Sequence, residues 1–212
     1  VVLATQPTAD VTIDLTGTQV GFDAAPITFT TSDWSMPHPV VVSAVQDDID
    51  ETPDPHAGLV ELDVHSTDPV YDAWPLTDIP VDVTDDDTAG VSVTPGSTPV
   101  AVAEAGTTSA TYDVVLESEP TAPVTITVAP DAQVTAIPTT LTFTPGDWDT
   151  VQHVTVTAVD DDVDEAAVHP GTVAHTATSA DTHYAGIALD DQPVDVADND
   201  DSGVSVTPTT LA

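Results

Sequence analysis

The sequence predicts an all-β protein built from tandem immunoglobulin-like antiparallel β-sandwiches. Two observations lead to this prediction. The pentapeptide Val-Ser-Val-Thr-Pro at 91–95 returns 113 residues later, at 204–208, which indicates an internal repeat. Within each repeat, short segments alternate apolar residues with Thr, and no segment shows the apolar stripe of an amphipathic helix.

The repeat extends over nearly the whole chain and sets the expected domains. The acidic segment 44–51 corresponds to 158–165, and Tyr71 corresponds to Tyr184. Adjacent repeats of this size are typical of modules that stack in a line. The predicted domains are, in chain order, a sandwich lacking its first strand at 1–89, a complete sandwich at 90–202, and at 203–212 the first strand of a next module or a donor strand.

Strand-like alternation is clearest in the second repeat, at residues 124–128, 141–144 and 154–159. Val, Ile and Thr favour strands, and a period of two places successive side chains on opposite faces of a sheet. Pro, Gly and Asp interrupt these segments, as expected for turns. We therefore expect half-buried antiparallel strands whose Val and Ile side chains face a core and whose Thr side chains face water.

The charge of the chain excludes several classes of partner. The 212 residues include 37 Asp plus Glu and no Lys or Arg, so the formal net charge is −37. No basic patch exists to bind nucleic acid or an anionic membrane surface. The apolar runs are too short to span a bilayer, and there is no Cys for a disulfide or a thiolate metal site. So many carboxylates without fixed counter-charges point to a cation supplied from solution.

Four landmarks follow one another in a fixed order. They are Gly-Val-Ser-Val with a following Glu (90–93, Glu104), Thr-Phe-Thr-Pro-Gly-Asp-Trp at 142–148, a Val-Thr-Val strand leading into acidic residues 160–165, and Val-Asp-Val-Ala-Asp-Asn-Asp at 194–200. This order resembles the Calx-β family of Ca²⁺-binding β-sandwich modules, and the resemblance covers essentially the whole chain. It implies modules of the kind found in sodium–calcium exchangers and in tandem arrays on bacterial surface proteins.

The resemblance implies Ca²⁺ as the cofactor, held where two acidic loops meet at one end of each sandwich. Ca²⁺ takes six to eight oxygen ligands, which one Asp run cannot supply alone. An isolated Asp is more typical of a turn, but dense acidic runs that recur once per repeat favour metal binding. The candidate ligands in the second repeat are Glu104, Asp160, Asp161, Asp162, Glu165, Asp198, Asn199 and Asp200. Those in the first repeat are Asp47, Asp48, Glu51, Asp85, Asp86 and Asp87.

The histidines and tryptophans are interpreted as structural residues. No pair of His has the i, i+2 or i, i+4 spacing of a zinc site next to a third ligand. Trp34 and Trp148 each follow an Asp at a strand start, which favours packing at the sandwich edge. The seven His, expected to be solvated or to pack, are His38, His56, His65, His153, His169, His175 and His183; of these only His56 and His169 correspond between repeats.

The ends of the repeats leave two arrangements open. Val1 corresponds to Val114, so the first repeat lacks the counterpart of residues 91–113, while residues 203–212 match 90–99. One arrangement is an excerpt from a longer tandem array. The other is strand exchange, in which the tail of one copy fills the open edge of the next. Both predict a linear, head-to-tail assembly of neighbouring modules or copies.

These features predict a non-enzymatic extracellular or cell-surface structural protein that forms a Ca²⁺-stiffened fibre or stalk. One alternative is a calcium-dependent adhesin module, for which the unrepeated Trp74 and Pro75 are the candidate patch. Another is a glycan-cleaving enzyme, since paired carboxylates suffice for that chemistry. Thr residues near Pro leave O-linked glycan open as an addition, although Thr is also the expected solvent-facing residue of the strands.

Overall fold

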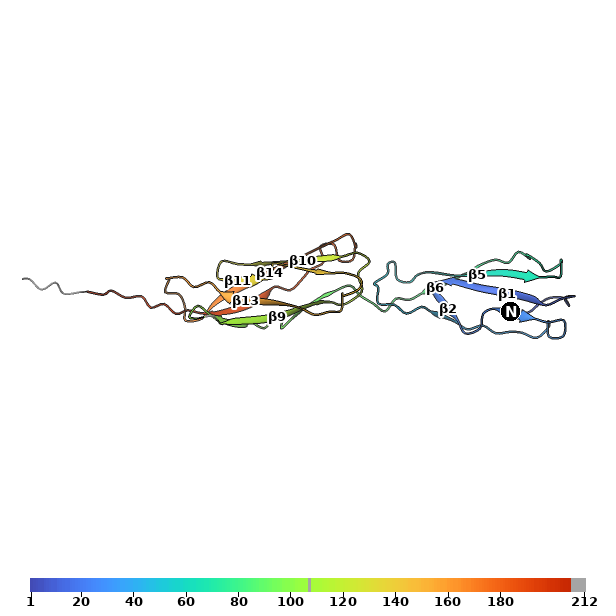
Figure 1. Ribbon diagram of the computed structural model, residues 1–212, viewed down its shortest axis with the longest axis horizontal. Helices are drawn as coiled ribbons and strands as arrows, with labels where there is room; N and C mark the ends of the chain where they lie inside the picture. The colour runs from blue at the N-terminus through green and yellow to red at the C-terminus, as the bar shows by residue number, and fades with distance from the viewer. Residues whose placement is uncertain (107, 207–212) are drawn as a thin grey trace, which may run out of the picture. The chain divides into compact units, whose positions relative to one another are not determined.

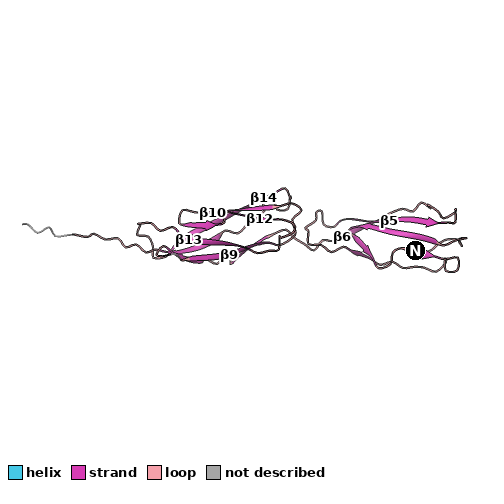
Figure 2. Cartoon of the chain, viewed as in Figure 1, coloured by secondary structure: helices cyan, strands magenta, loops and turns pink. Residues whose placement is uncertain are grey.

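The computed structural model describes residues 1–106 and 108–206, and these form strands, turns and loops without a helix (Figure 1; Figure 2). The all-β prediction is confirmed. The described chain has fifteen strands and falls into two compact units. Unit 1 is Val1–Asp86, and unit 2 begins at Asp87. No helix of the described residues has the length and hydropathy needed to cross a membrane.

Unit 2, coloured green to red in Figure 1, contains two sheets. The five-stranded sheet has the order β12 (Thr140–Phe143), β10 (Val124–Pro130), β14 (His169–Ser179), β15 (Gln192–Ala197), β8 (Val100–Ala103). The four-stranded sheet has the order β11 (Val134–Ile137), β13 (Gln152–Ala158), β9 (Ser109–Leu116), β7 (Val91–Thr94). Strands far apart in sequence are thus neighbours in both sheets.

One hydrophobic core joins the two sheets of unit 2. Ile126 and Phe143 come from the five-stranded sheet, Tyr112 and Val154 come from the four-stranded sheet, and each is at most 1% exposed. Within β10, the Val and Ile side chains are buried and the intervening Thr side chains are not. The predicted period of two is confirmed here. Burial of each large apolar side chain contributes about 1.5–3 kcal/mol.

One strand pair departs from the predicted antiparallel arrangement. β8 pairs with β15 in parallel, with Val100 opposite Val194 and Ala103 opposite Ala197. Burial alternates along Val-Ala-Val-Ala in β8, but alternation contains no information about which strand lies beside it or in which direction. The consequence is local and important, because the residue after β8 is Glu104, whose N–H donates to the Ala197 carbonyl at 3.1 Å.

Unit 1 repeats part of this arrangement with smaller sheets. One sheet has the order β3 (Ile27–Phe29), β1 (Val11–Thr18), β5 (His56–Ser66), β6 (Ile79–Val83), and the other pairs β2 (Val20–Phe22) with β4 (Val42–Ala44). Its buried apolar residues form two separate clusters, one around Phe29 and one around Val60. The core of unit 1 is therefore less continuous than that of unit 2.

The division between the units falls three residues before the predicted one. The sequence places the boundary after Ala89, whereas the contacts place it after Asp86. Ala89 packs against the core of unit 2, and the Gly90 carbonyl accepts a hydrogen bond from the Glu117 N–H at 2.9 Å. At the other end, residues 203–206 are exposed and form no strand with other described residues; the rest of the predicted segment 203–212 lies outside the described residues.

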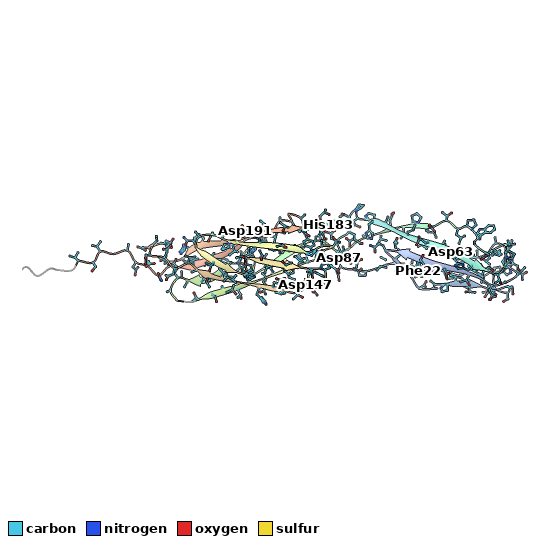
Figure 3. The ribbon with its side chains drawn as sticks, turned by 45° about the horizontal axis from the view of Figure 1, so that its top comes forward. Phe22, Asp63, Asp87, Asp147, His183 and Asp191 are labelled. Atoms are coloured by element: carbon cyan, nitrogen blue, oxygen red, sulfur yellow. The ribbon has the colours of Figure 1, made fainter. Side chains whose placement is uncertain are left out.

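Matching side-chain contacts fix equivalent turns in the two units. Asp147, labelled in Figure 3, accepts hydrogen bonds from the N–H and hydroxyl of Thr144, and Asp33 does the same with Thr30. These hydrogen bonds lower the pKa of both carboxyl groups. The adjoining indoles pack against the hydrophobic clusters of their own units, as predicted for Trp34 and Trp148.

A second matching contact differs in burial between the units. The Tyr184 hydroxyl donates to the Ser118 carbonyl at 2.7 Å and accepts from the Ser118 N–H at 3.1 Å. Tyr71 makes the same two bonds with Thr5, at 2.6 and 3.3 Å. Tyr184 and Ser118 are both at most 1% exposed, whereas Thr5 is exposed. Water can therefore replace the tyrosine hydroxyl as hydrogen-bond partner of the Thr5 backbone, but it cannot reach the Ser118 backbone.

We expect Tyr184→Phe to destabilise unit 2 more than Tyr71→Phe destabilises unit 1. Removing the Tyr184 hydroxyl leaves a buried N–H and a buried carbonyl without partners, which costs about 1–3 kcal/mol. The matched change in unit 1 should cost less than about 1 kcal/mol, because its partners reach water. Urea unfolding followed by circular dichroism measures both. Equal losses would contradict this account.

Candidate metal centre

The acidic loop after β13 and the run that leaves β15 lie together in unit 2, joined by three hydrogen bonds. The Glu165 N–H donates to Asp198 Oδ2 at 2.9 Å. The Asn199 amide donates to Asp160 Oδ1 at 3.1 Å, and the Ser202 N–H donates to Asp164 Oδ2 at 2.8 Å. Backbone and amide donors therefore hold two negatively charged segments side by side in the absence of any basic side chain.

Glu104 joins these segments because of the parallel pairing of β8 with β15. It is only 2% exposed. One ligand atom each from Glu104, Asp198 and Asp200 lies within 4.8 Å of the others. Oxygens bound to one Ca²⁺ at 2.3–2.6 Å can be at most about 5 Å apart across the ion. The three carboxylates are thus already close enough to share one cation.

Three carboxylate oxygens in this region are buried and accept no hydrogen bond from the described residues. They are Glu104 Oε2, Glu165 Oε2 and Asp200 Oδ2. An unpaired buried carboxylate oxygen is costly, and protein carboxylates usually avoid that state by pairing or by binding a metal. All three oxygens belong to residues that the sequence predicts as metal ligands.

The charges of the cluster act on one another. Burial raises the pKa of Asp200, and the carboxylates of Asp198, Asp162, Asp160 and Asp161 raise it further. The pKa of Asp198 is lowered instead, mainly by the hydrogen bond from the Asp200 N–H. The loop carboxylates thus lie near enough to repel Asp200. They are nevertheless outside the tight groups of ligand atoms found among the described residues.

His169 also belongs to this site, although the sequence interpretation treated it as a packing residue. It is 8% exposed, and its Nε2 lies 3.3 Å from Glu104 Oε1 and 3.2 Å from Glu165 Oε2. One imidazole nitrogen therefore faces two carboxylates, and a single N–H cannot satisfy both. Two features of the sequence indicate a role for His169 at this site: its correspondence with His56 and its i, i+4 spacing from Glu165. The sequence does not show that Glu104 lies beside it.

Unit 1 contains a partial equivalent. The Glu51 N–H donates to Asp85 Oδ2 at 2.7 Å, which matches the bond between Glu165 and Asp198. Burial raises the pKa of Glu51, and the nearby carboxylate of Asp47 raises it further. His56 Nε2 lies 3.3 Å from Glu51 Oε2, as His169 does from Glu165.

The remaining candidates of unit 1 lie less centrally. The consecutive residues Asp85, Asp86 and Asp87 offer ligand atoms within 4.8 Å of one another. Asp47 Oδ1 accepts the Ile49 N–H at 3.1 Å, as expected for a turn. Among the described residues, Asp48 joins none of the tight ligand groups. The structure thus brings the second set of predicted ligands together more completely than the first.

Comparison with known proteins adds no functional assignment. No protein-family model and no curated protein sequence matches the chain, so the resemblance to the Calx-β family remains a prediction. The crystal structure of the E. coli chaperone DraB is 8% identical, with a TM-score of 0.36 over 51% of this chain and 54% of that chain. The Salmonella enterica SafA pilin in complex with the SafB chaperone is 15% identical, with a TM-score of 0.37 over 56% and 58%.

A Porphyromonas gingivalis W83 protein of unknown function is 13% identical, with a TM-score of 0.35 over 89% of this chain and 85% of that chain. The match covers 54% of the DraB chain and 58% of the SafA–SafB chain, so this chain spans little more than half the length of either. Similarities this weak support no inference about function.

The donor chemistry of unit 2 fits a hard divalent cation. Glu104, Glu165, Asp198 and Asp200 supply carboxylate oxygens. A pocket of about 240 Å³, whose lining includes Glu165, Asp198 and Asp200, leaves room for water ligands. In the metal-free protein, these carboxylates repel each other with one imidazole between them. A cation held by Glu104, Asp198 and Asp200 would reduce that repulsion.

We expect Asp200→Asn to stabilise metal-free unit 2 at neutral pH. The folded-state pKa of Asp200 is raised above 3.8, so its ionisation favours the unfolded state, and this penalty develops as pH rises through that value. In the presence of chelator, the urea midpoint of the variant should exceed that of the parent protein at pH 7. The difference should disappear toward pH 3, where Asp200 is protonated in both states.

Asp195→Asn is the matched control for this measurement. It removes one carboxylate from an exposed position on β15, shortly before the cluster. A gain of similar size in the control would assign the effect to the net charge of the chain rather than to repulsion at the site.

Proposed function

We propose that this chain is a non-enzymatic extracellular structural protein whose units are tandem immunoglobulin-like β-sandwiches stabilised by Ca²⁺. One observation carries the proposal. Two groups of possible ligand atoms share Glu104: one includes Glu165 and His169, the other Asp198 and Asp200. Glu104, Glu165 and Asp200 each keep a buried carboxylate oxygen without a hydrogen bond in a chain that has no Lys or Arg. The single Nε2 of His169 cannot pair with all of these oxygens, and a cation from solution would pair those that it leaves.

Calcium suits this set better than the other common divalent ions. The donors are mainly carboxylate oxygens on loops, and Ca²⁺ accepts many oxygens in flexible geometry. Mg²⁺ requires a near-ideal octahedron and keeps its waters, which three fixed carboxylates do not favour. Structural zinc sites use Cys and His, whereas this group offers no Cys and a single His.

The position of the ligands gives the ion a mechanical role. Glu104 follows β8, Glu165 precedes β14, and Asp198 and Asp200 follow β15. An ion bound to all of them would link three separate segments at one end of unit 2. It would also fix the run through which the chain leaves that unit. A chain of modules held in this way would resist bending and extension, as a fibre or stalk requires.

Recurrence supports a structural role over catalysis. The bond between Glu51 and Asp85 and the contact between Glu51 and His56 repeat those of Glu165 in unit 2. A site used for architecture is expected in each module, whereas an active site needs to occur once. The high net negative charge also requires cations in the medium, which screen the repulsion between the carboxylates of the chain.

We expect Ca²⁺ to raise the melting temperature of unit 2 and Glu104→Gln to abolish most of this response. At a concentration one hundred times the dissociation constant, the ion contributes about 2.7 kcal/mol, which corresponds to a shift of about 5 °C or more. Differential scanning calorimetry in Ca²⁺, Mg²⁺ and chelator measures the response.

Glu117→Gln provides the control, because it makes the same charge change at an exposed position of unit 2. Identical melting curves for the parent protein in Ca²⁺ and in chelator would rule out the proposed role of the ion. A full Ca²⁺ response in the Glu104→Gln variant would place the ion elsewhere.

A further inference from the structure

The first residues of unit 1 form an edge with no strand on one side. Val1 exchanges backbone hydrogen bonds with His38, at 2.7 and 2.8 Å, and the Leu3 N–H donates to the Trp34 carbonyl at 3.2 Å. Successive residues of an extended segment point their backbone groups to opposite sides. The N–H and carbonyl of Val2 therefore face away from these partners, and no described residue pairs with them.

Unit 2 shows what occupies the same edge when a strand is available. Its segment Val114–Leu116 has the same sequence as Val1–Leu3, Val-Val-Leu. Its Leu116 N–H makes the matching bond to the Trp148 carbonyl at 3.3 Å. On its other side, Val114–Leu116 pairs antiparallel with Val91–Val93 of β7. Among the described residues, no strand pairs with Val1–Leu3 in the way that β7 pairs with Val114–Leu116.

An apolar groove lies beside the open edge of unit 1. Its volume is about 330 Å³, and its lining includes Val1, Leu3, Trp74 and Leu76. Val1 is 48% exposed and Trp74 is 53% exposed. In unit 2, the counterpart of Val1 is Val114, which is fully buried. The apolar surface that is exposed at Val1 is therefore buried at its counterpart in unit 2, which pairs with β7.

The chain itself contains a second copy of the covering strand. Gly203–Val206 has the sequence Gly-Val-Ser-Val, identical to Gly90–Val93. Val204 is 92% exposed and Val206 is 82% exposed. These two valines make no strand contact with other described residues. The same molecule thus contains an exposed segment with the sequence of a covering strand and an edge with the sequence that such a strand covers.

We propose that Gly203–Val206 of one copy adds as an antiparallel strand to Val1–Leu3 of a second copy. The pairing of β7 with β9 fixes the register, with Val204 opposite Leu3, Ser205 opposite Val2 and Val206 opposite Val1. Val206 then occupies the position that Val93 occupies in unit 2, where that side chain is 8% exposed. This inference rests on the proposed function, because it names the contact that joins copies in the proposed linear assembly.

Two physical arguments favour a second copy as the occupant. Neither pairing segment contains an acidic residue, so the contact brings no carboxylates together in a chain of net charge −37. Strand addition supplies main-chain hydrogen bonds for affinity and side-chain pockets for specificity. The contact joins two different surfaces of the same molecule, so each added copy presents a new open edge, and the copies extend into a line unless the rotation between them closes a ring.

The first test compares Val206→Asp with Ser205→Asp in the full 212-residue chain by analytical ultracentrifugation. Both variants add one negative charge to the same exposed segment outside the folded sheets. We expect the parent protein and Ser205→Asp to form concentration-dependent multiples of 21.8 kDa. Val206→Asp should remain a monomer, because its charge would enter the apolar groove. A parent protein that stays monomeric at all concentrations would overturn the proposal and leave the groove to a different ligand.

The second test checks the register by cross-linking. The parent chain has no Cys, so Val2→Cys and Ser205→Cys introduce one thiol each in separate chains. Directly opposed residues of antiparallel strands have Cα atoms about 4.5–5.5 Å apart, within the range of a disulfide. Mixing the two variants under mild oxidation should give a covalent heterodimer, whereas Val2→Cys mixed with Ser202→Cys should not. Equal yields from both mixtures would exclude the proposed register.

Repeating both tests in Ca²⁺ and in chelator separates this inference from the proposed function. Loss of assembly in Val206→Asp supports strand addition even if the melting curve of the parent protein ignores Ca²⁺. A Ca²⁺-dependent melting curve combined with a monomeric parent protein would retain the ion site and reject strand addition.

Discussion

The structure depends on stabilising many carboxylates without a single Lys or Arg side chain. Many Asp side chains are stabilised instead by hydrogen bonds from backbone N–H groups and hydroxyl groups. Asp68 accepts from the N–H groups of Thr8 and Val70, and these bonds lower its pKa. Burial alone would raise the pKa of Asp181, but bonds from the His183 and Thr121 N–H groups lower it overall. Each of these carboxylates therefore accepts one bond within its own turn and one from a backbone segment 60 residues away in the sequence.

The end of unit 2 is where this solution is incomplete. Asp198 uses both oxygens to accept backbone N–H bonds, yet Glu104 and Asp200 each keep one buried oxygen without a donor. Burying an unpaired carboxylate costs more than burying an apolar side chain of similar size. The buried Glu104 beside other carboxylates is therefore unfavourable for folding in the absence of a cation. The proposed cation would offset this cost, because its charge would attract the carboxylates that otherwise repel one another.

The sequence predicted more of the fold than of the site, for a physical reason. Alternation of Val with Thr reports which faces are buried, and the repeat reports where each module starts; both are local or periodic signals. The parallel pairing of β8 with β15 is neither, because strand partners depend on the whole topology. The sequence shows residues 160–165 and 198–200 as acidic runs. It does not show how close His169 lies to them in space. His169 reaches Glu104 across 65 residues, a distance that spacing rules for metal sites do not cover.

The two open features of the molecule, the charged site and the free strand, are coupled through the chain that connects them. Asp200 precedes Gly203 by only three residues, a span of about 10 Å at full extension. The Ser202 N–H donates to Asp164 Oδ2, so the chain is held at the acidic cluster one residue before Gly203. Ordering a segment before it binds lowers the entropy lost on association. In the proposed assembly, an ion at Glu104, Asp198 and Asp200 would therefore strengthen the contact between copies without touching it, because it would restrict the motion of the residues from which the donor segment starts.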